Sequence, residues 1–479
     1  MFKYRPHIVT GGVLLLVTQL AQAGTALTVT QFGAKGDGVT DDYVAIQAAA
    51  AALCKSPGAS LTFPPGTYLI NRHRVIAGTN QNTNKDIQYV GCNGVTITGY
   101  GAKIDVQGNF YRNADSKPSS QYAISYDEGI IPFYMLNSTG FSIVGFELDG
   151  NVDRMTRNSL VMEGLNAGVL TRNCSNYQLR DLYVHHFHTD GISLGHGSMV
   201  ADRGAVLTNI TSKNNARQGL SIMQVRDARI VGSLFSETGK TGAYGMHLPG
   251  AGADIEPERA PPSVDVATGL IDFDNCRFEE NLGSQYISSW PNRVDSATVR
   301  NSIIKATAPG LDPAVFLNAA AVATVSGNTF YLTGQRAVVL GPTKTEFYPY
   351  LSRVVYSGNT FNLVDRKGLY SPILSAPVEF TGNTVKISAP APESGFLMMT
   401  NMKRVDSNTF SIAGTGYAGS TSTLPYVIVF QAVPTVTANK YSTDLTGTKK
   451  FYTIYYGAGI TVSAESFLSS ANFAPLTIK

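Results

Sequence analysis

The sequence carries little charge for its length. Only 15 % of the 479 residues are Asp, Glu, Lys or Arg, and 37 basic against 34 acidic residues leave a formal net charge of +3. A nearly neutral surface argues against nucleic acid or an anionic membrane as the main partner, because both bind through clustered basic side chains. An acidic glycan stays open, since a cleft can be basic while the whole surface is neutral.

Two catalytic motifs are missing. The chain contains no His-Glu-x-x-His run, and no Gly-x-Ser-x-Gly elbow follows a strand in the required context. Both a zinc enzyme of the first type and a nucleophilic-serine enzyme of the second type are therefore disfavoured.

Long hydrophobic runs are missing as well. Lys3 and Arg5 precede an apolar stretch from Ile8 to Leu20, which is too short for a membrane span and is broken by polar residues and glycine. Ala21-Gln22-Ala23 then fits a cleavage site. We expect residues 1–23 to be a signal peptide, and the mature chain to be secreted or periplasmic without a membrane contact.

The stretch from Gln31 to Asn71 is the most specific part of the chain. A glycine-rich loop at 33–38 precedes Thr40-Asp41-Asp42, which offers a helix N-cap and acidic residues for the first turn. The alanine-rich run from Tyr43 to Lys55 predicts the helix itself. This block resembles the N-terminal cap of the pectate-lyase-like superfamily of right-handed parallel β-helix proteins. The resemblance implies an all-β solenoid with a short N-terminal capping helix, acting on a polysaccharide.

A repeat of 24 to 31 residues runs through the C-terminal half. It is marked by one asparagine after a short β-rich run, at Asn275, Asn301, Asn328, Asn359, Asn383, Asn408 and Asn439. Stacked asparagines can hydrogen-bond along a column, and asparagine tolerates the left-handed backbone of a tight turn. A repeat of this length predicts one solenoid coil per unit.

Earlier coils follow the same rhythm more loosely. The expected strands are Phe141–Asp149, Tyr177–Val184, Val206–Thr211 and Ala228–Phe235. Two long excursions, Gly108–Ile131 and Lys240–Val266, are expected to build the binding face, as long loops on a rigid scaffold often do.

We therefore predict one β-helix domain over residues 24–479. It divides into a cap region at 24–75, catalytic coils at 137–300 and structural coils at 301–479. The last part has few acids or histidines at strand positions and is compatible with an oligomer surface.

The four cysteines have different expected roles. Export permits disulfides, and Cys54 and Cys92 can meet near the cap. Cys174 and Cys276 are about four coils apart, which at about 4.8 Å per coil is about 19 Å and beyond the reach of a disulfide. We expect these two to be small buried residues.

Ionisable side chains concentrate between Tyr183 and Glu258. Three coils align there through a glycine, at 190–194, 218–222 and 251–256. Alternation along a strand places Ser193, Ser221 and Asp254 in one outward column, with Glu256 on the same face. The alternate residues, Ile192, Leu194, Leu220, Ile222, Ala253 and Ile255, then fill the core.

Asp254 and Glu256 lie about 6.6 Å apart along the strand. Two carboxylates at that separation on an exposed face suit acid/base cleavage of a glycosidic bond. One of the two must be protonated and the other ionised. Arg217, at the edge of the preceding coil, could hold the second one ionised or bind a substrate carboxylate.

Two further segments resemble known families. Thr189-Asp190-Gly191 resembles the Asn-Thr-Asp-Gly element of the polygalacturonase family, with His188 in place of the asparagine, and this implies a catalytic Asp190. Gly195-His196-Gly197 resembles that family's Gly-His-Gly element, although it follows on the same coil. The family's paired aspartates and its Arg-x-Lys element are missing. Residues 214–219 and 252–257 resemble a pairing found in poorly characterised bacterial β-helix proteins.

The candidate site residues follow from these patterns. The candidate catalytic residues are Asp190, Asp254, Glu256, His188 and Arg217. The candidate substrate-binding residues are Lys213, Gln218, Tyr244, His247 and Trp290, of which the last is the only tryptophan and could stack on a sugar ring. His185 and His186 are adjacent in sequence, so at most one of them is expected to face the site.

Three functions stay open. Hydrolysis by the carboxylates is slightly favoured, needs no cofactor and involves no metal. In β-elimination on a uronic-acid-containing glycan, His188, Lys213 or Tyr244 would be the base, and Arg217 would neutralise the developing charge. Ca²⁺ could assist such a lyase through Asp190, Asp254, Glu256 and Glu258. The third function is non-catalytic glycan binding or adhesion.

Overall fold

The computed structural model of the chain describes most of the sequence. The described residues are 24–70, 86–107, 125–128, 130–154, 161–197, 200–240, 249–257, 268–288, 294–308, 315–317, 320–333, 338–339, 353–364, 369–370, 376–388, 396–400, 402–412, 427–431, 433–443, 452–456, 460–468 and 477–478. The predicted signal peptide lies outside them.

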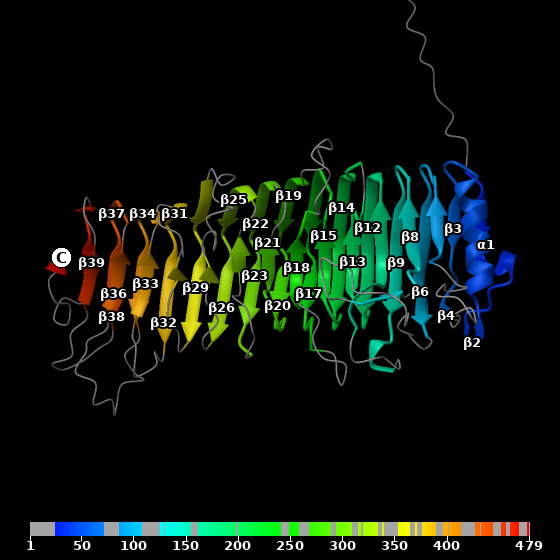
Figure 1. Cartoon of the computed structure of the whole chain (residues 1–479), viewed down its shortest axis with the longest axis horizontal. Coiled ribbons are helices and arrows are strands. Elements are labelled where there is room, and N and C mark those ends of the chain that lie inside the picture. The colour runs from blue at the N-terminus through cyan, green and yellow to red at the C-terminus, as the bar shows by residue number, and fades with distance from the viewer. Residues whose placement is uncertain are drawn as a thin grey trace, which may run out of the picture.

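The strands wind into one long solenoid (Figure 1). The coils stack along its long axis, from α1 (Tyr43–Cys54) at the N-terminal end to the C-terminus at the other end. The pairings join a strand to its counterpart one coil later, and they are parallel, as between β12 and β14 or β13 and β15. The predicted right-handed parallel β-helix with a short N-terminal helix is confirmed.

The largest sheet wraps two faces of the solenoid. The long strands β12 and β14 run through both faces, and β14 pairs first with β16 and then with β17. The 26 strands of this sheet are β1 (Ala26–Thr28), β2 (Asp37–Asp41), β3 (Ser60–Thr62), β4 (Gly66–Ile70), β6 (Thr96–Val106), β9 (Ser142–Asp149), β12 (Ser175–His185), β14 (Arg203–Lys213), β16 (Asp227–Val231), β17 (Leu234–Ser236), β19 (Thr268–Asp274), β20 (Arg277–Glu279), β22 (Val294–Arg300), β23 (Ile303–Ala306), β25 (Ala320–Ser326), β26 (Thr329–Thr333), β28 (Arg353–Ser357), β29 (Thr360–Val364), β31 (Ala376–Thr381), β32 (Thr384–Ser388), β34 (Met402–Asp406), β35 (Thr409–Ile412), β37 (Thr435–Thr437), β38 (Lys440–Thr443), β40 (Thr461–Ser463) and β41 (Ser466–Leu468).

The third face is a sheet of ten strands, followed by one of four. The ten are β5 (Gln88–Val90), β8 (Phe133–Leu136), β11 (Ala167–Arg172), β13 (Asp190–Leu194), β15 (Gln218–Ile222), β18 (Ala251–Ile255), β21 (Tyr286–Ser288), β24 (Val315–Leu317), β27 (Val338–Val339) and β30 (Leu369–Tyr370). The four are β33 (Phe396–Thr400), β36 (Val427–Gln431), β39 (Tyr452–Tyr456) and β42 (Thr477–Ile478). A separate pair joins β7 (Ser125–Glu128) to β10 (Val161–Leu165), and two short 3-10 helices are η1 (Val29–Phe32) and η2 (Val152–Arg154).

The four expected strands of the earlier coils are confirmed as β9, β12, β14 and the pair β16 and β17. The excursion expected at Lys240–Val266 contains β18, the strand expected at 251–256, and its residues 241–248 and 258–266 lie outside the described residues. Within these strands alternate side chains point into a continuous core, where aromatic rings of successive coils stack, as Phe141 does on Tyr177 and Phe330 on Phe361.

The N-terminal cap contains the predicted helix, but the expected acidic first turn is wrong: Thr40 and Asp41 belong to β2, and the side chain of Asp42 makes no capping hydrogen bond. The helix α1 covers the first coil, and Asp42 is its N-cap residue. The buried carboxylate of Asp42 accepts hydrogen bonds from the backbone N–H groups of Lys35 and Gly36, at 2.6 and 3.0 Å, so it holds the glycine-rich loop against the helix.

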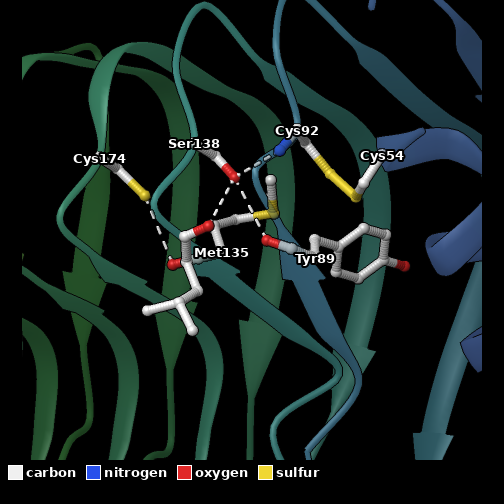
Figure 2. Close-up of a disulfide and its surroundings, with 7 residues drawn as sticks. Cys54, Tyr89, Cys92, Met135, Ser138 and Cys174 are labelled. Carbon is white, nitrogen blue, oxygen red and sulfur yellow. Dashed lines mark hydrogen bonds between the residues drawn. A yellow bond between two sulfur atoms is a disulfide. The ribbon is translucent and has the colours of Figure 1, made fainter. Parts of the chain in front are cut away.

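A disulfide joins Cys54, at the end of α1, to Cys92 in the first full coil (Figure 2). The backbone N–H of Cys92 donates to the hydroxyl of Ser138, one coil further on. Cys174 and Cys276 are buried free thiols, as expected. Burial raises the pKa of both thiols, to about 12 for Cys174 and to about 11 for Cys276, so neither is a reactive nucleophile.

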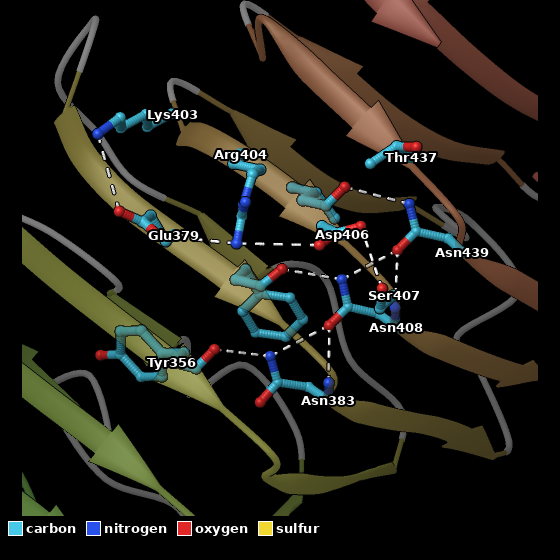
Figure 3. A network of polar contacts seen from close by, with 12 residues as sticks. Tyr356, Glu379, Asn383, Lys403, Arg404, Asp406, Ser407, Asn408, Thr437 and Asn439 are labelled. Atoms are coloured by element: carbon cyan, nitrogen blue, oxygen red, sulfur yellow. Dashed lines mark hydrogen bonds and ion pairs between the residues drawn. The ribbon is translucent and has the colours of Figure 1, made fainter. Parts of the chain in front are cut away.

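A ladder of buried asparagines runs along the C-terminal coils (Figure 3). From Asn359 onward, each side-chain oxygen accepts hydrogen bonds from the backbone N–H and the amide of the asparagine one coil earlier. Each amide also donates to a backbone carbonyl. The members are Asn328, Asn359, Asn383, Asn408 and Asn439, and Glu465 accepts the last hydrogen bonds.

The first two asparagines of the predicted column lie one residue before the ladder position. Asn275 and Asn301 are not ladder members. They take left-handed backbone, with φ of 54° and 52°, at the position held by Gly327 and Gly358 in later coils. The ladder position in these two coils belongs to Cys276 and Ser302, and the Ser302 backbone N–H donates to Asn328. Asparagine therefore occurs at two adjacent positions of a coil. At one it takes the left-handed backbone of the turn, and at the next its amide joins the ladder. The sequence repeat does not distinguish the two positions.

Among the described residues, no helix is both long enough and apolar enough to cross a membrane.

Candidate active site

The three aligned coils are the strands β13, β15 and β18 of the ten-stranded sheet. Their predicted register is confirmed: Ser193 lies beside Ser221, and Ser221 lies beside Asp254. The predicted exposure is wrong. All five residues of each strand are buried, and the side chain of Asp254 is only 1 % exposed. Alternation along a strand predicts to which face of the sheet a side chain points, but it does not predict whether other parts of the chain cover that face.

Two consecutive residues of the middle coil hold carboxylates of the coils on either side. Arg217 donates two hydrogen bonds to Asp190, from Nε to Oδ1 at 2.8 Å and from an Nη to Oδ2 at 2.7 Å. The amide of Gln218 donates to Oδ2 of Asp254 at 2.8 Å. Arg217 therefore pairs with Asp190, while the neutral amide of Gln218 meets Asp254.

The other predicted site residues lie elsewhere on these coils or outside the described part of the chain. Glu256 follows the end of β18 and is half-buried, so it is more accessible than Asp254. Lys213 ends β14 and forms an ion pair with Glu237, with an Nζ to Oε2 distance of 3.3 Å. His188 is fully buried, and its backbone N–H donates to the side chain of Asn166. Tyr244, His247, Trp290 and Glu258 lie outside the described residues.

A second polar cluster lies where β12 ends. His185 and His186 bring their Nδ1 atoms to 2.6 Å, and Nδ1 of His185 is 3.6 Å from Oδ1 of Asp149. The two rings contact each other, although adjacent residues of a strand point to opposite faces. His186 takes left-handed backbone with φ of 56°, which turns its ring back toward that of His185.

Acidic and basic side chains from neighbouring coils complete this cluster. Asp149 and Glu147 of β9 lie in register with His185 and Tyr183 of β12, and Lys103 of β6 lies in register with Glu147. Lys103 Nζ is 2.6 Å from Oδ2 of Asp149. Lys103, Glu147 and Asp149 are absent from the predicted site. Glu147 and Asp149 could have been predicted by aligning the expected strand Phe141–Asp149 with the strand one coil later, which places them beside Tyr183 and His185.

Burial and charge oppose each other in this cluster. Burial alone would raise the pKa of Asp149, but the hydrogen bond from Lys103 and the nearby His185 hold that pKa below its usual value. Burial lowers the pKa of His185, against the pull of Asp149, so its imidazole tends to be neutral. Among the described residues, Asp149, His185 and His186 have donor atoms that all lie within 4.8 Å of one another.

Two sequence families match the chain. The one described as rhamnogalacturonase A/epimerase, pectate lyase-like, matches residues 26–244, and the one described as right handed beta helix region matches residues 167–349. Over these residues the predicted resemblance to the pectate-lyase-like superfamily of right-handed β-helix proteins is confirmed. No curated protein matches the sequence significantly.

Solved structures share the general architecture at low similarity. The A-module of a mannuronan C-5 epimerase from Azotobacter vinelandii is 17 % identical over 92 % of this chain and 99 % of that one, with a TM-score of 0.42. A family 28 exopolygalacturonase of Yersinia enterocolitica is 11 % identical over 95 % and 78 %, with a TM-score of 0.44. The surface adhesin PfbA of Streptococcus pneumoniae is 13 % identical over 95 % and 93 %, with a TM-score of 0.45. Scores this low carry no argument about function, and the three proteins differ in what they do.

Proposed function

We propose that this chain is an exported enzyme that hydrolyses glycosidic bonds of a polysaccharide. The substrate class rests on the superfamily, whose matched description names a rhamnogalacturonase and an epimerase. The observation that carries the reaction is the unequal surroundings of Asp254 and Glu256. Asp254 is buried and accepts a hydrogen bond from Gln218, whereas Glu256, two residues along, is half-buried at the end of the strand.

Glycosidases need two carboxyl groups in different states, one protonated to help the leaving oxygen depart and one ionised to act as base or nucleophile. Carboxyl groups in unequal surroundings divide these roles. Asp190, held in two hydrogen bonds by Arg217, supports the site by fixing the position of that guanidinium beside Gln218. The burial of Asp254 implies that the substrate reaches Glu256 first.

Elimination from a uronic acid has less support. It needs a cation to neutralise the substrate carboxylate and a base to remove the neighbouring proton. The basic groups here already face acids: Arg217 faces Asp190, Lys213 faces Glu237 and Lys103 faces Asp149.

The test is a panel of neutral and uronic-acid-containing polysaccharides, read both by release of reducing ends and by ultraviolet absorbance of unsaturated products. Reducing ends without an ultraviolet gain support hydrolysis. A matching ultraviolet gain means β-elimination and overturns the proposal. Binding to a glycan without any cleavage means an adhesion protein and overturns it as well.

Variants then test the placement. Asp254→Asn and Glu256→Gln should each lower turnover by at least a hundredfold, in line with the loss of an acid or base, with thermal melts near that of the wild type. Glu379→Gln is the matched control, because Glu379 lies on the outer face of the C-terminal coils and pairs with Arg353 and Arg404. Retained turnover in both site variants would contradict the placement even if hydrolysis itself is observed.

A further inference from the structure

The cluster at the end of β12 has the arrangement of a metal site. Three potential ligand atoms from neutral or acidic side chains converge there: Nδ1 of His185, Nδ1 of His186 and an oxygen of Asp149. Two nitrogen atoms at 2.6 Å cannot both carry a proton toward each other, so at least one of them presents a lone pair to the shared space.

The outer nitrogens of both rings face carboxylates. Nε2 of His185 is 3.4 Å from Glu147, and Nε2 of His186 is 3.3 Å from Asp153. Histidines that bind a metal usually donate their other ring N–H to a carboxylate, which fixes the tautomer and orients the ring. Here each ring has a carboxylate near Nε2, although Nε2 of His185 makes no hydrogen bond to Glu147. The two Nδ1 atoms face each other.

Asp149 is also prepared for this role. Its Oδ2 accepts from Lys103 at 2.6 Å, and its Oδ1 accepts from the backbone N–H of Asn151 at 3.0 Å. These contacts hold the carboxylate in place while Oδ1 stays directed at His185. Asp149 and His185 are 7 % and 6 % exposed, so water competes little for the site.

Two ammonium groups lie near the cluster. Lys103 pairs with Asp149, and Lys213, in register with His185, pairs with Glu237. The carboxylates of Glu147, Asp149, Asp153 and Glu237 outnumber them, which favours a cation.

We propose that His185, His186 and Asp149 bind one divalent transition-metal ion of the zinc class. Two imidazole nitrogens and one carboxylate oxygen suit Zn²⁺ and leave a fourth position for water or a sugar hydroxyl. Ca²⁺ does not fit, because it takes six or more oxygen ligands. With Zn–N bonds of about 2.0–2.1 Å, two ligand nitrogens lie about 3.3 Å apart, so the two rings must separate by about 0.7 Å when the ion enters.

This site is independent of the proposed hydrolysis, and its test measures binding. The untagged full chain is freed of metal with a chelator and titrated with Zn²⁺ against a chromophoric competitor. We expect one ion per chain. His185→Asn and His186→Asn should each weaken binding at least a hundredfold, and asparagine tolerates the left-handed backbone at 186. His196→Asn, a histidine outside the cluster, is the matched control and should bind as the wild type does.

Two further readouts keep the proposal testable if a histidine variant folds poorly. Asp153→Asn alters only a carboxylate behind His186 and should weaken Zn²⁺ binding about 10- to 100-fold. Co²⁺ bound to the wild type should give the intense visible bands of a four- or five-coordinate ion. Failure of the wild type to bind Zn²⁺, a weak six-coordinate Co²⁺ spectrum, or full binding by both histidine variants would each overturn the proposal and leave a proton shared by two imidazoles.

Discussion

At the scale of single residues, Asp202 is the clearest case of a buried acid outside the candidate site. Its carboxylate accepts hydrogen bonds from Thr171, from Tyr177 and from the backbone N–H of Cys174. These contacts lower its pKa, but burial outweighs them and raises the pKa to about 6. The folded state therefore holds this proton more tightly than the unfolded state does.

The sign of the pH effect follows. The stability that Asp202 contributes is fully present below the unfolded pKa near 3.8, and it is lost as the pH rises through about 6. Asp202→Asn removes the charge and should stabilise the fold at pH 8 by up to about 3 kcal/mol, with little effect at pH 4. Thermal melts of both proteins across this range check it. An equal difference at both pH values would contradict the assignment.

The ion pair between Asp190 and Arg217 makes a second residue-scale prediction. Both side chains are largely buried, at 4 % and 12 % exposed. Arg217→Met leaves the Asp190 carboxylate without its guanidinium and should cost about 3–5 kcal/mol of unfolding free energy. The double variant Asp190→Asn/Arg217→Met should recover most of that loss, because no charge is then left buried. Denaturant unfolding of the double-mutant cycle measures this, and simple addition of the two single effects would show that the pair is not coupled.

At the scale of structural elements, the asparagine ladder links the C-terminal coils. Asn383 donates to the carbonyl of Tyr356 and to Asn408, and its oxygen accepts two hydrogen bonds from Asn359. Asn383→Ala leaves these buried groups unsatisfied and should cost about 3 kcal/mol. Asn383→Ser should cost less unfolding free energy, because a serine, Ser302, already occupies the same position one coil before the first asparagine of the ladder.

Asn362→Ala is the control for the ladder. Asn362 lies in the same part of the solenoid, is only partly buried, and makes one hydrogen bond to the carbonyl of Phe330. Its loss should cost about 1 kcal/mol or less. Equal losses for the two variants in thermal or denaturant unfolding would mean that the ladder adds nothing beyond ordinary side-chain hydrogen bonds.

At the scale of the whole molecule, a solenoid is stabilised mainly by contacts between neighbouring coils, so stability is local along the axis. The N-terminal end is closed by α1 and by the disulfide of Cys54 and Cys92, which closes a loop of 38 residues. Under the chain-entropy model such a loop contributes about 4 kcal/mol. In the variant Cys54→Ala/Cys92→Ala, hydrogen exchange should quicken in α1 and β1–β4 and stay unchanged beyond residue 300. A uniform change along the chain would show that the solenoid unfolds as one unit.

Much of the architecture was decided by the sequence, because a solenoid repeats local patterns. The 28-residue step from Asp190 to Gln218, and the glycine shared by three coils, placed β13, β15 and β18 in the register that the structure has. The helix over Tyr43–Cys54 also follows from a short segment whose preference needs no distant contact. The pairing of Cys54 with Cys92 was predicted from export and from the place of both cysteines near the cap.

Only the tertiary structure decided what surrounds each side chain. The burial of Asp254 depends on what covers an outward face, and the contact of Lys103 with Asp149 joins residues one coil apart. The left-handed backbone of His186, just after the end of β12, lets two adjacent rings contact each other, although adjacent residues of a strand point to opposite faces. Periodicity is a property of the chain, so the sequence shows it. Proximity across coils is a property of the register and turns, so the candidate zinc cluster was visible only once the coils were stacked.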